Sequence, residues 1–302
     1  MVKAEDNTNT FKSGFVAIAG APNVGKSTLM NRMLGEKISI TSSKPQTTRN
    51  RILGVLHRPN AQLVFIDTPG IHKARSPLNI RIVDTALSVL GDVDLILLVA
   101  DASEPDSESE TVLVKKLLQQ NRPVILALNK IDLIKKPRLS EIIEKASGRY
   151  RFEKVVPVSA KQGSGIDELV QTMEALLPQG PPFFPPESLT DLPERFIAAE
   201  MIREKVFRLT GQEIPYATAV TVDRFETDAE TALVKIDASI HVERDSQKGI
   251  LIGKNGAKLK EIGSAARIDI EKMVGARVFL KLFVRVQKNW SRDTKALRRF
   301  GY

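Results

Sequence analysis

The stretch that decides the fold is "FVAIAGAPNVGKSTLMNRMLG", residues 15–35. It begins with an unbroken apolar run typical of a buried strand, passes through a glycine-rich loop and ends in a pattern typical of an amphipathic helix. The loop matches G-x-x-x-x-G-K-[ST] in the strand–loop–helix context that gives this motif its meaning. Backbone N–H groups of such a loop and the helix N-terminus can cradle a di- or triphosphate. We expect Lys26 to reach the β- and γ-phosphates and Ser27 to ligate Mg²⁺. The candidate loop consists of Gly20, Ala21, Pro22, Asn23, Val24, Gly25, Lys26, Ser27 and Thr28.

From Phe15 to about Leu177, short apolar runs alternate with amphipathic helical patterns. The runs are continuous rather than alternating, as expected for strands that are buried on both faces. This order predicts an α/β domain with a mainly parallel sheet and helices on both faces. The expected strands are 15–20, 62–67, 95–101, 124–130 and 155–159, and the expected helices are 27–35, 79–92, 109–120, 140–150 and 165–177.

The chain divides at "LPQGPPFFPPESLTD" (177–191), a proline-rich stretch that suits neither a helix interior nor a central strand. It predicts a semi-rigid linker at 178–192, between a first domain at 11–177 and a second domain at 193–302 that ends in a basic tail around residues 290–299. Residues 1–10 are expected to form a polar tail, because they lack the apolar core of a signal peptide.

Composition limits the classes of protein to consider. Hydrophobic residues make up 42% and charged residues 27% of the 302 residues, as in globular proteins large enough for two cores. The absence of cysteine excludes disulfides and thiolate metal sites, and no apolar run reaches the ~18–20 residues of a membrane span. The net charge of +9 is concentrated in residues 248–302, which hold 14 Lys or Arg and 4 Asp or Glu. A solvated basic surface is one explanation, and a site for a polyanion such as nucleic acid is the other.

The motif "NKID" (129–132) predicts the base that the first domain accepts. The Asp132 carboxylate can accept hydrogen bonds from both the N1–H and the 2-amino group of guanine, whereas adenine offers neither donor. Leaving such buried groups unpaired is costly, so the motif favours guanine. Asn129 can bond the neighbouring loops and the purine edge, and the aliphatic stem of Lys130 can lie over the ring.

A further contact is expected from "VSAKQG" (158–163), where Ser159, Ala160 and Lys161 follow the last expected strand. We expect the Ala160 N–H to face the guanine carbonyl. Each of these motifs follows an expected strand, and open α/β sheets bind ligands outside the carboxyl ends of their strands.

Together these motifs resemble those of the small P-loop GTPases that act as switches. The resemblance implies that "ISITSSKPQTTRNR" (38–51) is a first switch, in which Thr48, or failing that Thr47, ligates Mg²⁺ and touches the γ-phosphate. It also implies that "DTPG" anchors a second switch, with Asp67 acting on Mg²⁺ through water and the Gly70 N–H contacting the γ-phosphate. The second set of nucleotide-binding candidates is therefore Asp67, Thr68, Pro69 and Gly70.

The next residue, Ile71, can neither donate nor accept a hydrogen bond to orient the attacking water. One interpretation is a domain that binds GTP and barely hydrolyses it. The other, which related switches with an apolar residue here favour, is a K⁺ held by Asn23 that bridges the phosphates. In that case Asn23, Lys26, Thr48 and Gly70 are the catalytic candidates. The neighbouring His72 is expected to be a surface residue of the switch rather than a general base.

The second domain has a different pattern, in the order helix–strand–strand–helix–helix–strand. The first expected helix, within residues 192–211, carries its apolar residues on one face. In the expected strand 232–244, alternate apolar residues share one face and His241 lies on the opposite face, which predicts a strand packed on one side. "GILIGKNGAKLKE" (249–261) places G-x-x-G between two expected helices. A plain helix–helix turn would explain the glycines, but the element order and the local positive charge favour a loop that faces phosphate.

These features resemble a KH domain of the αββααβ type, whose loop clamps about four nucleotides of single-stranded nucleic acid. Ile250 and Ile252 are either the floor of the groove or part of the core. The RNA-binding candidates are Ile250, Ile252, Gly253, Lys254, Asn255, Gly256 and Lys258.

A GTP switch joined by a proline-rich linker to one KH domain resembles the Era family of GTPases over nearly the whole chain. The resemblance rests on "GAPNVGKS", "KPQTTR", "DTPGIHK", "NKID", "VSAKQG", "GILIGKNG" and the "EIPY" run at 213–216. It implies GTP hydrolysis with Mg²⁺, binding of the 3′ end of the small-subunit ribosomal RNA, and a role in biogenesis of that subunit. It also implies a monomer in the bacterial cytoplasm with weak association with the inner membrane. Ala21 departs from the arginine that the family often carries there.

Two alternatives to this function stay open at this point. One is an RNA-binding module with negligible GTP turnover. The other is a membrane-surface GTPase that uses its basic C-terminal region on anionic lipid.

Overall fold

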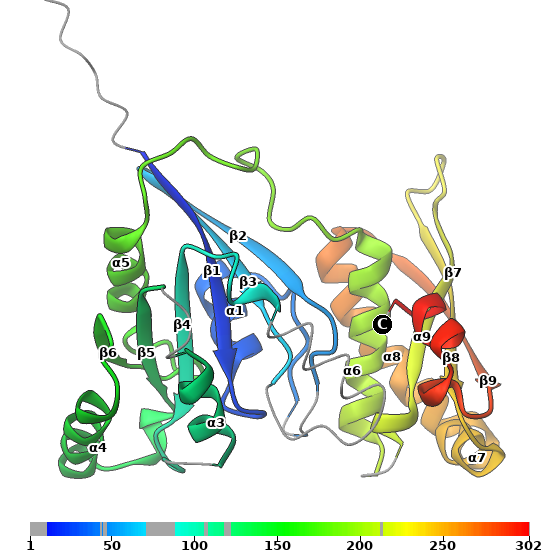
Figure 1. The fold of residues 1–302 in the computed structure, drawn as a ribbon. Coiled ribbons are helices and arrows are strands. Elements are labelled where there is room, and N and C mark those ends of the chain that lie inside the picture. Colours follow the sequence, from blue (N-terminus) through cyan, green and yellow to red (C-terminus); the bar gives the residue numbers. More distant parts are fainter. Residues whose placement is uncertain are drawn as a thin grey trace, which may run out of the picture. The chain divides into compact units, whose positions relative to one another are not determined.

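The computed structural model describes residues 11–42, 44, 47–70, 88–105, 108–117, 122–211 and 214–301. Within these ranges the chain forms two compact units (Figure 1). The first unit contains residues 11–36, 51–70 and 88–191, and the second contains residues 37–50 and 192–301. Among the described residues, no helix combines the length and the apolar composition needed to cross a bilayer.

The first unit is built on a six-stranded sheet in the order β2-β3-β1-β4-β5-β6. All five expected strands are present, and neighbouring pairs among them run parallel. β2 was not predicted from the sequence. It pairs antiparallel with β3 across a tight turn at 59–60 and forms one edge of the sheet. The strands are β1 (Lys12–Gly20), β2 (Ile52–Arg58), β3 (Ala61–Asp67), β4 (Leu95–Asp101), β5 (Val124–Asn129) and β6 (Lys154–Pro157).

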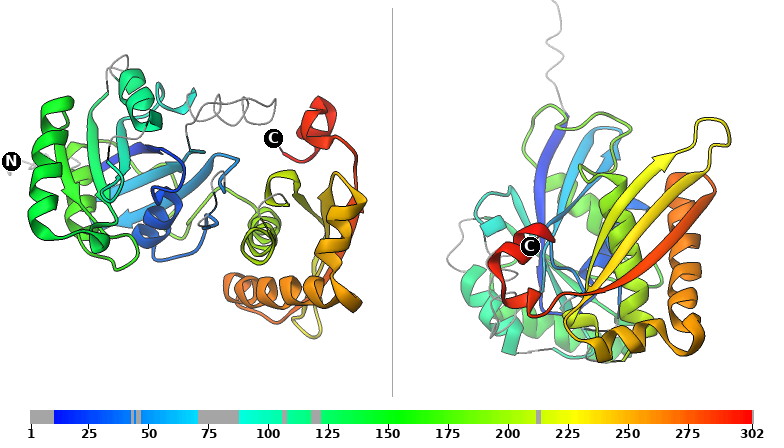
Figure 2. Two further views of the ribbon diagram at one scale, coloured as in Figure 1. Left: turned by 90° about the horizontal axis from the view of Figure 1, so that it is seen from below. Right: turned by 90° about the vertical axis from the view of Figure 1, so that its right-hand side faces the viewer.

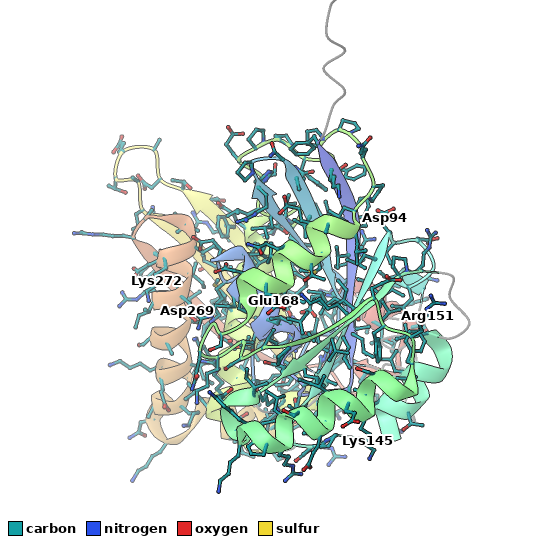
Figure 3. The ribbon with its side chains drawn as sticks, turned by 90° about the vertical axis from the view of Figure 1, so that its left-hand side faces the viewer. Asp94, Lys145, Arg151, Glu168, Asp269 and Lys272 are labelled. Carbon is teal, nitrogen blue, oxygen red and sulfur yellow. The ribbon has the colours of Figure 1, made fainter. Side chains whose placement is uncertain are left out.

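Helices cover both faces of this sheet. Leu113 of α3 and Ile142 of α4 pack with Leu98 and Leu126 in a core on one face, and α1 and α5 lie against the other (Figure 2). Figure 3 shows Lys145 on α4 and Glu168 on α5. Residues 79–87 of the helix expected at 79–92 lie outside the described residues. The helices are α1 (Lys26–Leu34), α3 (Glu108–Leu117), α4 (Lys136–Arg149) and α5 (Ile166–Leu176), with the short 3₁₀ turn η1 (Ile131–Leu133).

The proline-rich segment, expected as a semi-rigid linker, packs along the free edge of β2. The Val55 N–H donates to the Leu189 carbonyl at 2.9 Å, and Thr190 Oγ1 donates to the Leu53 carbonyl at 2.6 Å. Gln62 is fully buried and accepts hydrogen bonds from the N–H groups of Phe183 and Phe184. The segment therefore covers an edge strand that would otherwise expose unpaired backbone groups.

The second unit confirms the expected order of elements. Its three-stranded sheet has the order β7-β8-β9, with β7 antiparallel and β9 parallel to the central β8. One face, which we call the inner face, packs against α6, α7 and α8 and carries the alternating apolar residues predicted for β8. The elements are α6 (Glu194–Leu209), η2 (Pro215–Ala217), β7 (Ala219–Thr227), β8 (Val234–Val242), α7 (Asp245–Ile252), η3 (Lys254–Gly256), α8 (Ala257–Val274), β9 (Val278–Val286), η4 (Trp290–Arg292) and α9 (Thr294–Arg299).

Three expectations for this unit were wrong. The C-terminal region is folded rather than a tail, because Trp290 is fully buried and packs with Ala219 and Phe300 over one end of the outer face of the sheet. His241, predicted on an exposed face of β8, is therefore buried against Phe300, with ring centroids 4.5 Å apart. Helix α6 is buried along residues 197–207 and has no single apolar face.

Candidate nucleotide and nucleic-acid sites

The expected phosphate loop connects a strand to a helix, which is the context that its sequence predicted. It joins β1 to α1, and its Asn23 and Gly25 adopt left-handed backbone conformations with φ of 64° and 99°. Lys26 is buried, and its Nζ donates to the carbonyls of Gly20 at 3.1 Å and Ala21 at 2.9 Å. Burial lowers the pKa of Lys26 to about 8, and the nearby Asp67 partly opposes this effect. A desolvated cation held by carbonyl oxygens at a helix N-terminus is well placed to pair with phosphate.

The "DTPG" segment lies beside this loop in the same unit. Ser27 Oγ donates to Asp67 Oδ2 at 2.6 Å, which brings together two of the expected Mg²⁺ ligands. A Cβ on Gly70 would lie 2.9 Å from the Pro22 backbone, so the two loops touch where a side chain would keep them apart. Thr68 supports the turn through a 2.8 Å hydrogen bond from Oγ1 to the Ile18 carbonyl. Ile71 and His72 lie outside the described residues.

The base-recognition motifs also meet at the carboxyl ends of the strands. Asn129 Nδ2 donates to the Val24 carbonyl at 2.7 Å, which ties β5 to the phosphate loop. The Ala160 N–H, expected to face the guanine carbonyl, donates to Asn129 Oδ1 at 2.9 Å. Ser159 Oγ donates to Asp132 Oδ1 at 2.6 Å and so orients the carboxylate. The loops that are expected to contact phosphate and base are thus connected through Asn129.

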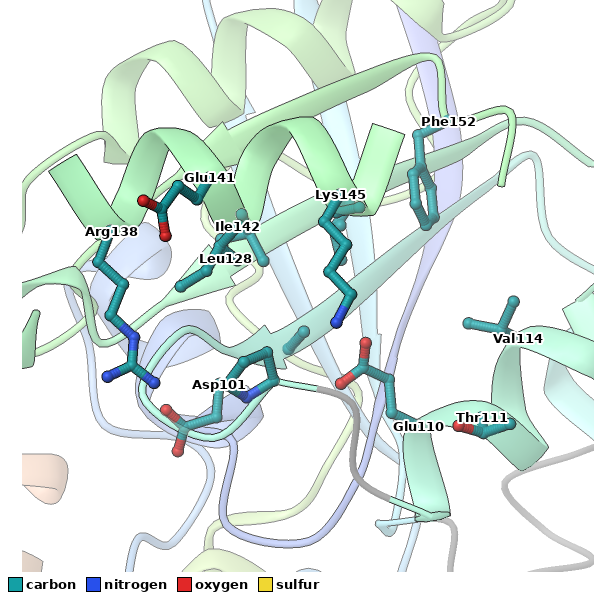
Figure 4. Close-up of a pocket in the computed structure, with 14 residues that line it drawn as sticks. Asp101, Glu110, Thr111, Val114, Leu128, Arg138, Glu141, Ile142, Lys145 and Phe152 are labelled. Carbon is teal, nitrogen blue, oxygen red and sulfur yellow. The ribbon is translucent and has the colours of Figure 1, made fainter. Parts of the chain in front are cut away.

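Asp101 is a neighbour of this site that the sequence analysis did not identify. Burial acts to raise its pKa, but hydrogen bonds from Lys130 and Ser103 hold the pKa below its usual value. The ion pair with Asp101 fixes Lys130, which adopts a left-handed conformation with φ of 66°. Asp101 also borders a cavity of about 440 Å³ between α3 and α4. Figure 4 shows Lys145 and Glu110 pointing toward each other across this cavity, which lies beside the base motifs rather than at the phosphate loop.

The described residues 37–42, 44 and 47–50, which we call the docked segment, pack within the second unit. Lys44 Nζ donates to the carbonyls of Phe207 and Thr210, each at 2.5 Å. Arg203 Nη2 donates to the Thr47 carbonyl at 2.5 Å. Arg49 is 3% exposed and donates to the carbonyls of three residues in the turn after α6, namely Pro215, Tyr216 and Thr218. The "KPQTTR" and "EIPY" runs, which are far apart in the sequence, are therefore in contact.

Thr48, the expected Mg²⁺ ligand of the first switch, is buried in this docked segment. The structure thus places Ser27 and Asp67 together in the first unit and Thr48 in the second.

A buried carboxylate fixes the start of the docked segment. Glu204 of α6 accepts hydrogen bonds from Lys37 Nζ at 2.6 Å and from the Thr41 N–H at 2.9 Å. Lys37 also pairs with Asp269 of α8 at 2.6 Å. Burial acts to raise the pKa of Glu204, but the bonds from Lys37 and Thr41 hold it below the usual value. The sequence pattern did not reveal the role of Glu204, because Lys37 and Thr41 are more than 160 residues away from it.

The G-x-x-G loop connects α7 to α8. Gly253 has φ of 70°, and a Cβ there would lie 2.7 Å from the Lys258 Cβ. Lys254 and Asn255 are exposed at the tip, and Asn255 is left-handed with φ of 52°. Ile250 is 54% exposed, which favours the groove over the core. The loop thus presents a lysine, an amide and the start of α8 to solvent, as phosphate binding requires.

Comparisons with known proteins agree with this geometry. The profile of the family described as "50S ribosome-binding GTPase" matches residues 15–130, and that of the KH domain matches residues 213–291. GTPase Era of Geobacter metallireducens is 57% identical over 97% of this chain and 99% of its own length. GTPase Era of Syntrophus aciditrophicus is 49% identical over 97% of this chain and 95% of its own length.

Two solved structures are similar over 97% of this chain and 99% of their own. An Era variant from Aquifex aeolicus bound to GDP·AlF4⁻ is 40% identical, with a TM-score of 0.94. Era in complex with MgGDPNP and nucleotides 1506–1542 of 16S ribosomal RNA is 41% identical, with a TM-score of 0.93. With both domains and nearly the full length matched, this chain belongs to the Era family of GTPases.

Proposed function

We propose that this chain hydrolyses GTP with Mg²⁺ and binds the 3′ end of 16S ribosomal RNA through its G-x-x-G loop, in the biogenesis of the small ribosomal subunit. The complex of the related Era with MgGDPNP and 16S RNA supports both ligands. The exposed Lys254–Asn255 tip and the concentration of basic residues after Lys248 supply the contacts that a single-stranded polyanion needs. In this proposal the chain acts in the cytoplasm.

In this proposal the first unit positions the triphosphate for attack by water. Lys26 pairs with the β- and γ-phosphates, the Gly70 N–H contacts the γ-phosphate, and Asp132 selects guanine. Ser27 and Asp67 fit Mg²⁺, because both present oxygen atoms and already lie 2.6 Å apart. Mg²⁺ in such sites neutralises the charge on the β- and γ-phosphates during transfer.

The docked segment carries the link between nucleotide and RNA. Thr48 must reach Mg²⁺ to complete the GTP site, yet its neighbours Thr47 and Arg49 are held by Arg203 and by the turn after α6. Because one segment carries Thr48 and also contacts α6, GTP binding in this proposal changes the contacts that α6 makes. Because linkage is reciprocal, RNA that favours one arrangement changes the affinity for GTP by the same factor.

Two measurements on the full chain test this function. Phosphate release from GTP is followed with and without RNA of nucleotides 1506–1542, and RNA affinity is compared in GDP and in GDPNP. We expect RNA to change the hydrolysis rate and GDPNP to change RNA affinity. Replacement of Lys254 and Asn255 by aspartate should remove both effects while leaving basal hydrolysis intact. If GTP turnover is negligible under every condition, the chain is an RNA-binding module instead.

We also propose that K⁺ bound by Asn23 bridges the phosphates and supplies positive charge there, in a site where Ile71 cannot orient the attacking water. The left-handed, exposed Asn23 at the loop tip supports this role. Replacing Na⁺ by K⁺ should raise the rate of hydrolysis, and Asn23→Ala should remove that increase without preventing GTP binding. An equal rate in both salts contradicts the proposal. Association with anionic membranes is the remaining proposal, and co-sedimentation with liposomes in competition with RNA tests it.

A further inference from the structure

Strand β9 carries an unusual outward face. Its inner residues, including Leu280 and Leu282, pack on the helices. On the opposite face Phe279 is 51% exposed and Phe283 is 47% exposed. Lys281 and Arg285 alternate with them and are also exposed. We call Phe279, Lys281, Phe283 and Arg285 the β9 strip.

The two rings are spaced as separate platforms. Phe279 and Phe283 lie four residues apart on one strand, which is about 13 Å along the sheet. They cannot stack on each other at that distance, so each ring is available to a different planar partner. Exposed phenylalanine on the solvent face of a small sheet has no role in the core, whereas stacking on aromatic rings is the common way to hold unpaired bases.

The charges of the strip suit a polyanion. Among the described residues no carboxylate lies within ion-pair distance of Lys281, whose Nζ lies 5.5 Å from the centroid of the Phe279 ring. Arg285 has only a long contact with Asp223, at 3.4 Å, and both side chains are largely exposed. Such exposed pairs contribute little, so the guanidinium is available for phosphate.

The strip also continues into a larger basic surface. Beyond β9 the chain folds back over the end of the sheet through the buried Trp290 and Leu297. This places exposed cations of the η4 and α9 region next to the strip, as the right-hand view of Figure 2 shows for the strands and the C-terminal segment. These cations are Lys288, Arg292, Lys295, Arg298 and Arg299.

The position of β9 connects the strip to the G-x-x-G groove. β9 is an edge strand, and α7, which leads into the loop, is in contact with it. A KH groove holds only about four nucleotides, whereas the related complex contains nucleotides 1506–1542. A strand that leaves the groove over the β9 edge meets the strip next.

We propose that the β9 strip is a second binding site for single-stranded RNA, in which bases stack on Phe279 and Phe283 and phosphates pair with Lys281 and Arg285. The proposal rests on the RNA binding proposed above. A protein partner is less favoured, because the cores of protein interfaces are depleted in charge, whereas cations alternate with the rings here.

The test uses the full chain with GDPNP and Mg²⁺ and a nested set of RNAs cut from nucleotides 1506–1542. The set runs from about six nucleotides, near the capacity of the groove, to the whole fragment. In the wild type, affinity should rise once the RNA outgrows the groove. Phe279→Ala with Phe283→Ala should remove that rise, which lowers affinity for long RNA about tenfold or more per ring, and should leave affinity for the shortest RNA unchanged.

Three controls separate the possible outcomes. Ile268→Ala removes an equally exposed apolar side chain from α8 and should behave as wild type. Lys281→Gln with Arg285→Gln should reduce the salt dependence of long-RNA binding. Lys254→Asp with Asn255→Asp should weaken binding at every length. If the phenylalanine double variant keeps the gain with length, the strip is not an RNA site. If the wild type binds no RNA of any length, the proposed function fails as well.

Discussion

Replacement of Glu204 by glutamine tests whether α6 holds the docked segment. The Glu204 side chain is fully buried and accepts hydrogen bonds from Lys37 and from the Thr41 N–H. Glutamine keeps the shape but loses the charge, and it leaves the ammonium groups of Lys37 and Lys205 with Asp269 as their remaining carboxylate partner in the cluster.

The size of the effect follows from this burial. Removing one partner of a buried ion pair costs about 3–5 kcal/mol. Lys37 is one-third exposed and keeps Asp269, so we expect a loss of about 2–3 kcal/mol. With a urea m-value of about 1–3 kcal/mol/M, the urea midpoint should fall by roughly 0.7–3 M.

The assay uses the only tryptophan of the chain. Trp290 is fully buried in the second unit, so its fluorescence reports the unfolding of that unit. Glu226→Gln, which removes an exposed partner of Arg224 in the same unit, should shift the midpoint little, because exposed pairs contribute about 0–1 kcal/mol. Equal midpoints for Glu204→Gln and wild type would refute the reasoning.

The sign of the pH dependence gives a second check on Glu204. Because its pKa is lower in the folded chain than in the unfolded one, the carboxylate stabilises the fold above the unfolded value of about 4.5. This contribution is lost as the pH falls below that value through the folded pKa. The glutamine variant should therefore lose less stability than wild type on acidification.

Three further predictions concern the nucleotide site and the sheet of the second unit. Gly25→Ala should lower GDP affinity at least tenfold by calorimetry, because the new Cβ would lie 2.3 Å from Asn129 Nδ2. Gly35→Ala also changes a glycine with a left-handed φ, but it has nothing within 4 Å of the new Cβ and should bind GDP normally. Equal GDP affinity of the two variants would show that the contact with Asn129 is unimportant. Asp132→Asn should weaken GDP binding by about 2–4 kcal/mol, because an amide nitrogen cannot accept hydrogen bonds from the guanine donors. Calorimetry with GDP and with xanthosine diphosphate, whose 2-oxo group suits an amide donor, measures the change. Unaltered GDP affinity would contradict the role assigned to Asp132. Burial lowers the pKa of His241 to about 4, so unfolding takes up a proton between pH 4 and about pH 6.5. The free energy of unfolding of the second unit should therefore fall by up to about 3 kcal/mol as the pH drops through this window. The Trp290 urea midpoint of His241→Asn should decrease less than that of wild type, and an identical decrease would rule out this histidine.

The sequence predicted most of the first unit because its signals are local. An unbroken apolar run, the phosphate loop and an amphipathic helix follow one another within residues 15–35, and each depends only on its neighbours. β2 was missed for the opposite reason. It is an edge strand whose pairing with β3 depends on a two-residue turn, and the sequence of residues 52–58 is also compatible with a switch loop.

The contacts of the docked segment could not be predicted in this way. Glu204 and Arg203 look like solvated positions on an amphipathic helix, and only the fold brings Lys37, Thr41 and Thr47 to them. The same holds for His241, whose alternation in β8 predicted exposure. The C-terminal segment that buries it is basic and carries its apolar residues, Trp290 and Phe300, far apart.

If GTP binding and RNA binding are coupled through the docked segment, a thermodynamic cycle measures the coupling free energy directly. RNA affinity is determined with GDP and with GDPNP, and GDPNP affinity is determined with and without RNA of nucleotides 1506–1542, for wild type and Glu204→Gln. In wild type we expect the RNA affinities and the GDPNP affinities to give one and the same coupling factor, of about 5–150. In Glu204→Gln we expect a different factor. RNA affinity that is the same in GDP and GDPNP, or a coupling factor that Glu204→Gln leaves unchanged, would contradict this coupling.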